Sequence, residues 1–541
     1  MGILRRVLSN TSNSATWAAA LLGVASLASR FLGMIRDRLL SGEFGAGPEL
    51  DAYYAAFRAP DLMFGLFVGG AISAGFIPVF TRYVSRDTGN RMGQAANEFA
   101  SRVISVLGAG LTFFSLVGVA IAGWLVPLYT SGFTPAYQQI TIDLTRIMFA
   151  AIFFLGLSAV FSGILQTYKR FVVYSLAPVV YNLGIISGVI FLSSRFGIYG
   201  VAIGVCIGAF FHMLIQLLSV LRLGWRFSWL FDWREPGVRE MGRMMVPRTA
   251  SVGLEHLNLI ILTGVASTLG AGSLAVFTLA FNLQSLPVGV LGISFAVASF
   301  PFIAELAERG DHDGVRREFS HIVRTVLYLI IPATVAMLLL RAQLVRVILG
   351  TGNFDWANTV DTADAMAFFS ISLFAQALMP FIVKTFFAFH NVKWPLIVAA
   401  SSIVFERLLA WQLTAHGLGV SGLVLAYSIS AALRIVLLWV LLRLLIGALD
   451  ERRLLRSLTI MMAAAMAMAA TVQSLKTWIG GVVDMQSFLG VFTQGAVAGL
   501  LGIAVYVIVS YLLGSPEARQ LIRTFTARLS PVTIRDDYEQ H

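Results

Sequence analysis

The first two apolar segments of the sequence carry an unusual number of charged residues. Residues 29–64 read SRFLGMIRDRLLSGEFGAGPELDAYYAAFRAPDLMF and gather these charges near the segment ends. On a helix, Arg30, Gly33 and Asp37 share one stripe. Arg36 lies about 120° around the helix from Arg30, so the two arginines flank one face. Because a guanidinium suits phosphate and carboxylate groups, this spacing predicts a site for an anionic ligand.

A structural role for the same charges is the alternative. Arginine is costly at membrane depth unless it faces water or a partner. The arginines could snorkel to the membrane interface, or pair with Asp37 and Asp51 and so fasten the first two helices together. The sequence favours the anionic ligand and leaves the structural role open.

The composition of the chain indicates a polytopic membrane protein. Its 541 residues are 57% hydrophobic and 12% charged, with a mean hydropathy of +0.81. Soluble domains carry about twice that share of charged residues. The net charge of +11 would suggest nucleic acid binding in a soluble protein. In a membrane protein it is better explained by Lys and Arg in cytoplasmic loops, so no nucleic acid partner is expected.

Fourteen apolar runs approach or exceed the roughly 20 residues that a membrane-spanning helix needs. The predicted fold class is therefore an all-α polytopic membrane protein. The first run follows Arg5 and Arg6 and imitates a signal peptide, but its helical spacing continues, so it is predicted to be the first span. The predicted spans are residues 14–38, 51–82, 99–128, 140–166, 173–194, 198–223, 241–269, 272–304, 321–349, 362–389, 394–415, 418–446, 455–477 and 487–514.

The loops between these spans alternate between loops rich in Lys and Arg and loops poor in them. The loops TSGFTPAYQQ, STLGAGS and TAHGLG, predicted to be outside, contain neither residue. This asymmetry predicts that both termini are cytoplasmic. The predicted inner positions include Arg82, Arg86, Arg91, Lys169, Arg170, Arg226, Arg234, Arg239, Arg309, Arg316, Arg317, Lys393, Arg452, Arg453 and Arg456.

An internal repeat divides the chain into two halves. The GAG tripeptides that begin at Gly45 and Gly270 both precede an Ala-Phe pair and a late proline. A second match pairs Gly200 with Gly422, which is 222 residues further on. We therefore predict two six-helix lobes in a parallel repeat, residues 1–223 and 224–447. Two further helices follow at 448–514, and a cytoplasmic tail at 515–541. Such a repeat is typical of transporters with alternating access, and a channel is disfavoured because no filter motif is present.

Motifs for covalent chemistry are absent from the sequence. The segment GLGVSG, from Gly417, fits a nucleotide-binding pattern but lies between two spans, so helix packing explains it better. The same packing role is predicted for the ladder of Gly200, Gly204 and Gly208. No enzyme activity, cofactor or metal site is predicted. Glu255 and His256 in the seventh span leave two alternatives open, a proton or cation site and a structural pair. Glu406 and Arg407 pose the same choice, and there a structural role is favoured.

The motifs of residues 29–80 resemble a known family. They read S-R-x-x-G-x-x-R-D, F-G-A-G, D-A-Y-Y-A-A-F-R-x-P-D-L and G-A-I-S-A-G-F-I-P-V-F, with further echoes at residues 145–149 and 287–292. They are similar to the MurJ/MviN family, lipid II flippases of the multidrug/oligosaccharidyl-lipid/polysaccharide exporter superfamily. The resemblance covers all fourteen segments.

This resemblance implies a central cationic cavity, a lipid groove beside the last two helices, and residence in the bacterial inner membrane. The implied activity is export of lipid II, the undecaprenyl-diphosphate-linked precursor of peptidoglycan. Arg30 and Arg36 would contact the diphosphate, and Asp37 would orient an arginine. Asp51 would contribute to outer gating or helix pairing. The implied partners are lipid II and membrane lipids, with a coupling ion or the membrane potential as the driving force.

The chain departs from the family pattern at three positions. Phe64 and Asn282 stand where members commonly have arginines, and Gly69 stands where they have an acidic residue. Losing two cations should weaken the attraction for a diphosphate, and Arg58, Arg243 or Arg248 could compensate. Two alternatives therefore stay open. The protein could export another polyprenyl-linked saccharide or a small molecule, or it could be a non-transporting scaffold for envelope assembly.

Overall fold

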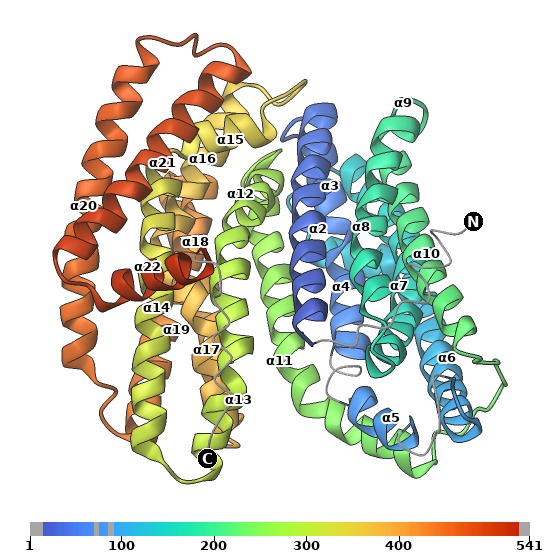
Figure 1. Cartoon of the computed structure of the whole chain (residues 1–541). Helices are drawn as coiled ribbons and strands as arrows, with labels where there is room; N and C mark the ends of the chain where they lie inside the picture. The colour runs from blue at the N-terminus through green and yellow to red at the C-terminus, as the bar shows by residue number, and fades with distance from the viewer. Residues whose placement is uncertain (1–14, 70–74, 85–90, 530–541) are drawn as a thin grey trace, which may run out of the picture. The chain divides into compact units, whose positions relative to one another are not determined.

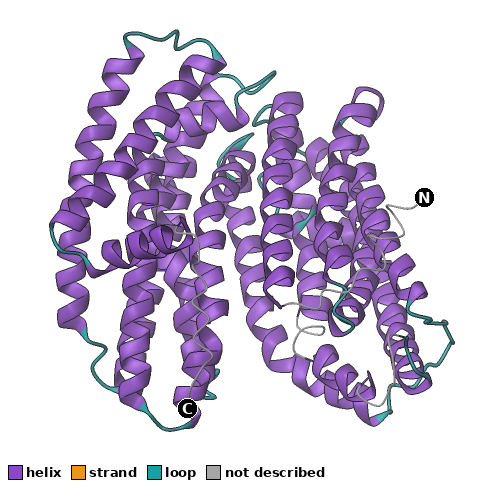
Figure 2. Ribbon diagram, viewed as in Figure 1, coloured by secondary structure: helices purple, strands orange, loops and turns teal. Residues whose placement is uncertain are grey.

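Helices make up all the regular structure of the part of the chain that is described. The computed structural model describes residues 15–69, 75–84 and 91–529, and no strand occurs in these ranges. Figures 1 and 2 show the long helices side by side within each part of the molecule. Long apolar runs form helices because a backbone in lipid must satisfy its hydrogen bonds internally. The predicted all-α fold is confirmed.

The helix boundaries follow the predicted spans, often with extra turns at the ends. The first half contains α2 (Ala15–Phe44), α3 (Pro48–Ala56), α4 (Arg58–Phe64), η1 (Gly65–Gly69), α5 (Ile77–Val84), α6 (Gln94–Leu125), η3 (Val126–Leu128), α7 (Pro135–Thr167), α8 (Phe171–Ser187), η4 (Gly188–Leu192), α9 (Ser193–Phe196) and α10 (Ile198–Arg222). The second half contains α11 (Pro236–Ser267), α12 (Ser273–Pro287), η5 (Val288–Ile293), α13 (Ser294–Glu308), α14 (His312–Leu339), α15 (Arg341–Leu349), α16 (Trp356–Ile371), α17 (Leu373–Ala388), α18 (Lys393–Leu413), η6 (Thr414–Leu418), α19 (Gly419–Ile446), α20 (Glu451–Gly480), α21 (Phe488–Leu512) and α22 (Pro516–Leu529).

The predicted count of fourteen spans is not confirmed. The described residues contain ten helices that are long and apolar enough to cross a membrane, or eleven if the pair α16 and α17, bent by 47°, is one span. Two predicted spans, α18 and α19, are counted together as Lys393–Ile446 because η6 joins them. The second predicted span is divided among α3, α4, η1 and α5.

The described residues group into two compact units. Unit 1 comprises Met1–Leu283, Ile348–Ala365 and Leu396–Ser430, and unit 2 comprises Gln284–Val347, Met366–Pro395 and Ala431–His541. This grouping follows contacts in space, whereas the boundaries at residues 223 and 447 follow a repeat in the sequence. The two repeated lobes therefore stay a prediction.

Glycines allow two helices of unit 1 to pack backbone against backbone. A Cβ atom added to Gly184 of α8 would lie 2.2 Å from the Cα of Gly208 on α10. A Cβ atom added to Gly204 of α10 would lie 2.6 Å from the Cα of Gly188 in η4. The glycine ladder of α10 therefore serves helix packing, as the sequence predicted. The predicted packing role of Gly417 is wrong, because a Cβ atom there would meet nothing within 4 Å and its φ of +83° marks the break in η6.

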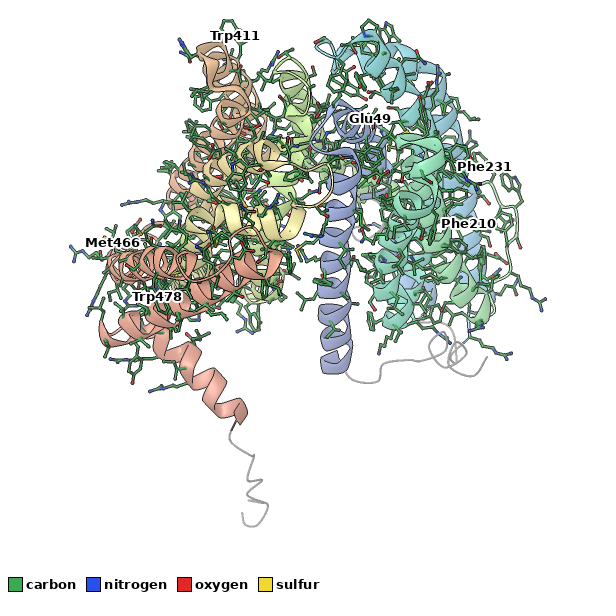
Figure 3. The ribbon with its side chains drawn as sticks, turned by 90° about the horizontal axis from the view of Figure 1, so that it is seen from above. Glu49, Phe210, Phe231, Trp411, Met466 and Trp478 are labelled. Atoms are coloured by element: carbon green, nitrogen blue, oxygen red, sulfur yellow. The ribbon has the colours of Figure 1, made fainter. Side chains whose placement is uncertain are left out.

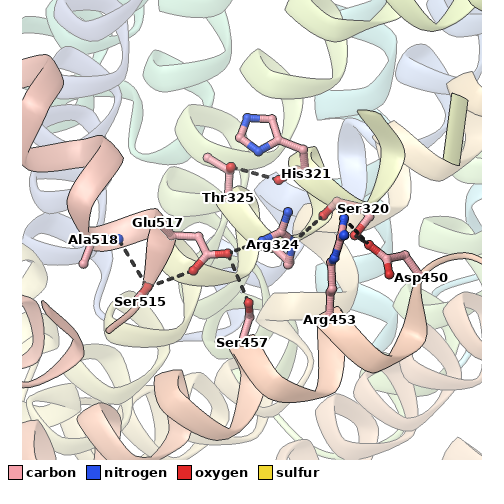
Figure 4. A network of polar contacts seen from close by, with 10 residues as sticks. All are labelled: Ser320, His321, Arg324, Thr325, Asp450, Arg453, Ser457, Ser515, Glu517 and Ala518. Carbon is pink, nitrogen blue, oxygen red and sulfur yellow. Dashed lines mark hydrogen bonds and ion pairs between the residues drawn. The ribbon is translucent and has the colours of Figure 1, made fainter. Parts of the chain in front are cut away.

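In unit 2, α20 and α21 pack on α14, and α22 folds back onto them. Glu517 at the start of α22 is buried and forms an ion pair with Arg324 of α14 at 2.8 Å. The hydroxyls of Ser457 on α20 and of Ser515 donate to the same carboxylate at 3.1 and 2.8 Å. Figure 4 shows this network. The predicted tail thus begins with a helix that is anchored by a buried charge.

Candidate functional site

Arg36 and Asp37 of α2 lie at the centre of a polar cluster in unit 1. The Nε and Nη2 atoms of Arg36 donate to Asp37 Oδ1 at 2.9 and 2.7 Å. Its Nη1 atom donates to Asn182 Oδ1 on α8 at 3.2 Å. The second carboxylate oxygen of Asp37 accepts from Asn282 Nδ2 on α12 at 3.0 Å. Three helices therefore fix one arginine and one aspartate.

The cluster leaves part of the guanidinium available. Asp37 is buried, whereas 23% of the Arg36 side chain is exposed. A guanidinium has five N–H donors, and the bonds to Asp37 and Asn182 use three of them. The remaining two can bind an anionic oxygen. Asn182 in turn donates to the hydroxyl of Ser29 and to the carbonyl of Pro178. These bonds fix the amide oxygen that accepts from Arg36.

Arg30 lies on the same helix without such bonds. Its side chain is half-buried. Among the described residues it takes part in no hydrogen bond and no ion pair. Arg30 and Arg36 are therefore different: Arg36 is oriented by neighbours, and Arg30 keeps all five donors for a ligand or for water.

Asp51 has a different environment, at the N-terminus of another helix. Its Oδ2 atom accepts from the backbone N–H of Gly272 at 2.6 Å, and its Oδ1 atom accepts from that of Ala275 at 2.7 Å. The side chain is 1% exposed. Helix α12 begins at Ser273, so the carboxylate satisfies donors that the helix leaves unpaired and lies at the positive end of its dipole. Asp51 thus ties α3 to α12 and lacks an exposed face for a ligand.

The remaining predicted cations are Arg58, Arg243 and Arg248, of which Arg243 is exposed. Arg58 of α4 donates from Nε to the hydroxyl of Thr263 on α11 at 2.9 Å, and from Nη2 to that of Thr278 on α12 at 3.4 Å. Its bonds to uncharged hydroxyls leave its charge unneutralised by direct contact. The side chain of Arg248 lies outside the described residues.

Several partners of Arg36 and Arg58 were missed from the sequence. Asn182, Thr263 and Thr278 are polar residues within apolar runs, and only that departure from the surrounding composition could have marked them. Tyr53 and Tyr54 of α3 are buried within electrostatic range of Arg36. Within the described part of the chain, the hydroxyl of Tyr54 has no hydrogen-bond partner, so it adds a polar group near the arginine.

The two members of each of the other ionisable pairs differ in exposure. Glu255 is exposed, and His256 is half-buried beside Gly65, where a Cβ atom would meet its ring at 2.5 Å. Glu406 is 2% exposed and accepts from Asn258 Nδ2 at 3.3 Å, whereas its neighbour Arg407 is exposed. The described residues contain no group of three metal-ligating side chains that could hold an ion.

The apolar helices, and the arginine that is held among them, define a polytopic membrane protein with a candidate site for an anion. The family described as "Lipid II flippase MurJ" matches residues 40–491. The chain therefore belongs to the MurJ family, and the family resemblance seen in the sequence is confirmed.

Curated relatives and solved structures agree with this assignment. The chain is 29% identical to "Lipid II flippase MurJ" of Burkholderia cenocepacia over 435 residues, 78% of this chain and 83% of that protein. It is 28% identical to "Probable lipid II flippase MurJ" of Treponema pallidum over 430 residues, 78% and 81% of the two chains. The structure titled "Lipid II flippase MurJ, inward closed conformation" matches with a TM-score of 0.75 and 22% identity. The match covers 93% of this chain and 100% of that chain. An inward-facing transporter of the MATE family in the MOP superfamily shares the fold, with a TM-score of 0.65 and 17% identity. The match covers 80% of this chain and 99% of that chain.

Proposed function

We propose that this protein exports lipid II from the inner to the outer leaflet of the bacterial inner membrane. Membership of the MurJ family and the names of its relatives support this substrate. The observation that carries the proposal is the geometry of Arg36. Its guanidinium is fixed by Asp37 and Asn182, and two of its donors are left over.

The proposed binding mode follows from the chemistry of these groups. A diphosphate offers several anionic oxygens, and a guanidinium binds such oxygens through parallel N–H donors. Arg36 would bind in a fixed orientation, and Arg30 would add a second, adaptable cation. Arg58 would contribute positive charge from α4. The isoprenoid tail would stay in lipid along α20 and α21, and no covalent chemistry is required.

The proposed cycle is alternating access of two lobes around a central cavity, with both termini cytoplasmic. The inward-facing and outward-facing MATE structures that share the fold support this cycle. The proposed driving force for resetting is the membrane potential, because moving one charge through 100 mV is worth about 2.3 kcal/mol. A coupled ion is the alternative driving force.

The decisive experiment is transport of labelled lipid II by the purified protein in liposomes. The variants Arg30→Ala and Arg36→Ala should insert normally and lose transport. Arg309→Ala is a matched control, because Arg309 forms an exposed ion pair with Glu305. Transport at the unaltered rate by both α2 variants would refute the assignment of the site.

Another polyprenyl-linked saccharide is the alternative substrate, because the family resemblance predicts that Asn282 stands in place of an arginine. Other polyprenyl-linked saccharides should therefore be offered to the same liposomes in parallel. Complementation of cells depleted of their own lipid II flippase separates transport from a scaffolding role. Rescue would exclude the scaffold.

A further inference from the structure

The segment between α10 and α11 alternates aromatic and non-aromatic residues. Residues 225–234 read WRFSWLFDWR, with an aromatic ring at every second position from 225 to 233. Trp225 is 5% exposed, whereas Phe227, Trp229, Phe231 and Trp233 are between 50% and 70% exposed. The first ring therefore anchors the segment, and the other four form a stripe on its outer side. We call residues 225–234 the aromatic strap.

Hydrogen bonds attach the aromatic strap to the side of α6. Arg226 exchanges two bonds with the Asn97 side chain, at 2.7 and 3.0 Å. The backbone N–H groups of Ser228 and Leu230 donate to the hydroxyls of Ser101 and Ser105, each at 3.4 Å.

This attachment depends on a match between two repeat lengths. Four residues of helix rise about 6 Å, and two residues of extended chain span about 6.6 Å. Every second residue of the strap therefore meets every fourth residue of α6. Beside this attachment, the four rings at positions 227, 229, 231 and 233 are exposed.

The level of the strap on α6 corresponds to a membrane interface. Arg102, which forms an ion pair with Glu98, is the last charged residue of α6, and residues 103–128 contain none. The hydrocarbon region should therefore begin near residue 103. Asn97 lies on the polar side of this level and Ser105 on the apolar side. The strap runs between them.

The chemistry of the strap suits the membrane interface in three ways. Backbone donors near lipid must be satisfied by protein, and the serine hydroxyls of α6 satisfy those of Ser228 and Leu230. Tryptophan and other amphipathic rings concentrate at the boundary between head groups and acyl chains. Arg226, Asp232 and Arg234 are exposed and would keep the strap from sinking deeper. Figure 3 shows Phe231 on the outer side of the helices of unit 1.

We infer that the aromatic strap is a lipid-binding surface, with its rings seated at the head group–acyl boundary of the bilayer and its arginines beside lipid phosphates. The exposed rings continue the lipid-facing side of α6, whose Phe113 and Leu116 are also exposed. The strap thereby fixes the level of unit 1 in the membrane. This role is independent of the transported substrate.

Fluorescence of the full-length protein in liposomes tests this inference. Cys206 is replaced by Ser, and a single cysteine at position 229 (Trp229→Cys) is labelled with an environment-sensitive dye. The matched control is Glu308→Cys, an exposed position at the end of α13. Dye at 229 should emit at shorter wavelength, and iodide in the buffer should quench it roughly threefold less than dye at 308. Lipids with a nitroxide near the head group should quench it more than lipids with a nitroxide near the chain end.

A second variant addresses the strap without a label. Because Phe227, Trp229 and Trp233 are exposed, replacing all three with Ala should leave the Tm in detergent unchanged and reduce the rise in Tm on adding lipid. Equal iodide quenching at positions 229 and 308 in liposomes would overturn the inference and indicate a surface for a soluble protein partner. An unchanged lipid-dependent rise in Tm would also overturn it.

Discussion

Asn282 of α12 donates a hydrogen bond to Asp37 of α2 across 245 positions of sequence, with 3.0 Å between Nδ2 and Oδ2. Asn282, which the family resemblance predicts to stand in place of an arginine, is therefore bonded to the site. An arginine here would neutralise Asp37 and add a cation, whereas the amide only positions the carboxylate. Asp37 then depends on Arg36 for its charge partner.

Asn282→Asp should destabilise the cluster. Two carboxylates would face each other at hydrogen-bond distance, and the bond from Nδ2 would be lost. We expect the free energy of unfolding to fall by about 1–3 kcal/mol at neutral pH. The loss should shrink in acid, because protonating one carboxyl removes the repulsion and restores a donor. Thermal unfolding in detergent across a pH series measures it, and a loss independent of pH would contradict the proposed pairing.

Arg36→Lys should retain the charge and lose most of the transport. An ammonium cannot bond Asp37 and Asn182 and still present parallel donors to a phosphate. Transport of lipid II in liposomes should slow by roughly tenfold. Arg309→Lys serves as the control, and equal rates for both variants would show that charge alone suffices.

Asp51→Asn should weaken the start of α12. The amide keeps one acceptor oxygen but turns its NH₂ group toward a backbone donor, and it lacks the charge that favours the helix N-terminus. The expected loss of stability is about 1–3 kcal/mol. Glu49→Gln, on the exposed side of α3 and labelled in Figure 3, should change stability by less than about 0.5 kcal/mol. Similar losses for the two variants would argue against a capping role.

Glu517→Gln should loosen α22 from unit 2. The substitution leaves the charge of Arg324 without its partner, and this arginine is only 15% exposed. Breaking a buried pair in this way costs about 3–5 kcal/mol. The exposed pair of Glu305 and Arg309 supplies the control, where Glu305→Gln should cost less than about 1 kcal/mol. Limited proteolysis in the segment after α21 measures the release of α22. Equal protection of both variants would count against Glu517 as the residue that anchors α22.

Gly204→Ala should force α10 away from α8. The added methyl would lie 2.6 Å from the Cα of Gly188, and backbone cannot move aside as a side chain can. The expected loss is about 1–3 kcal/mol. Gly110→Ala in α6 meets nothing within 4 Å and should stabilise by about 0.5–1 kcal/mol. Chemical denaturation of both variants provides the comparison, and a neutral Gly204→Ala would show that the packing is looser.

The sequence by itself determined the fold class and most helix boundaries. These features are local, because an apolar run long enough to cross lipid must be helical. The glycines of α10 were also recognisable, because small residues at helical spacing serve close packing.

Only the tertiary structure decided the partners of the charged residues. Asn182 and Asn282 reach Arg36 and Asp37 from α8 and α12, and Asp51 caps a helix that begins more than 200 positions away. The strap on α6 likewise depends on residues 97–105 meeting residues 226–230. Such contacts depend on how helices associate. The type of a residue does not indicate which distant element will lie beside it.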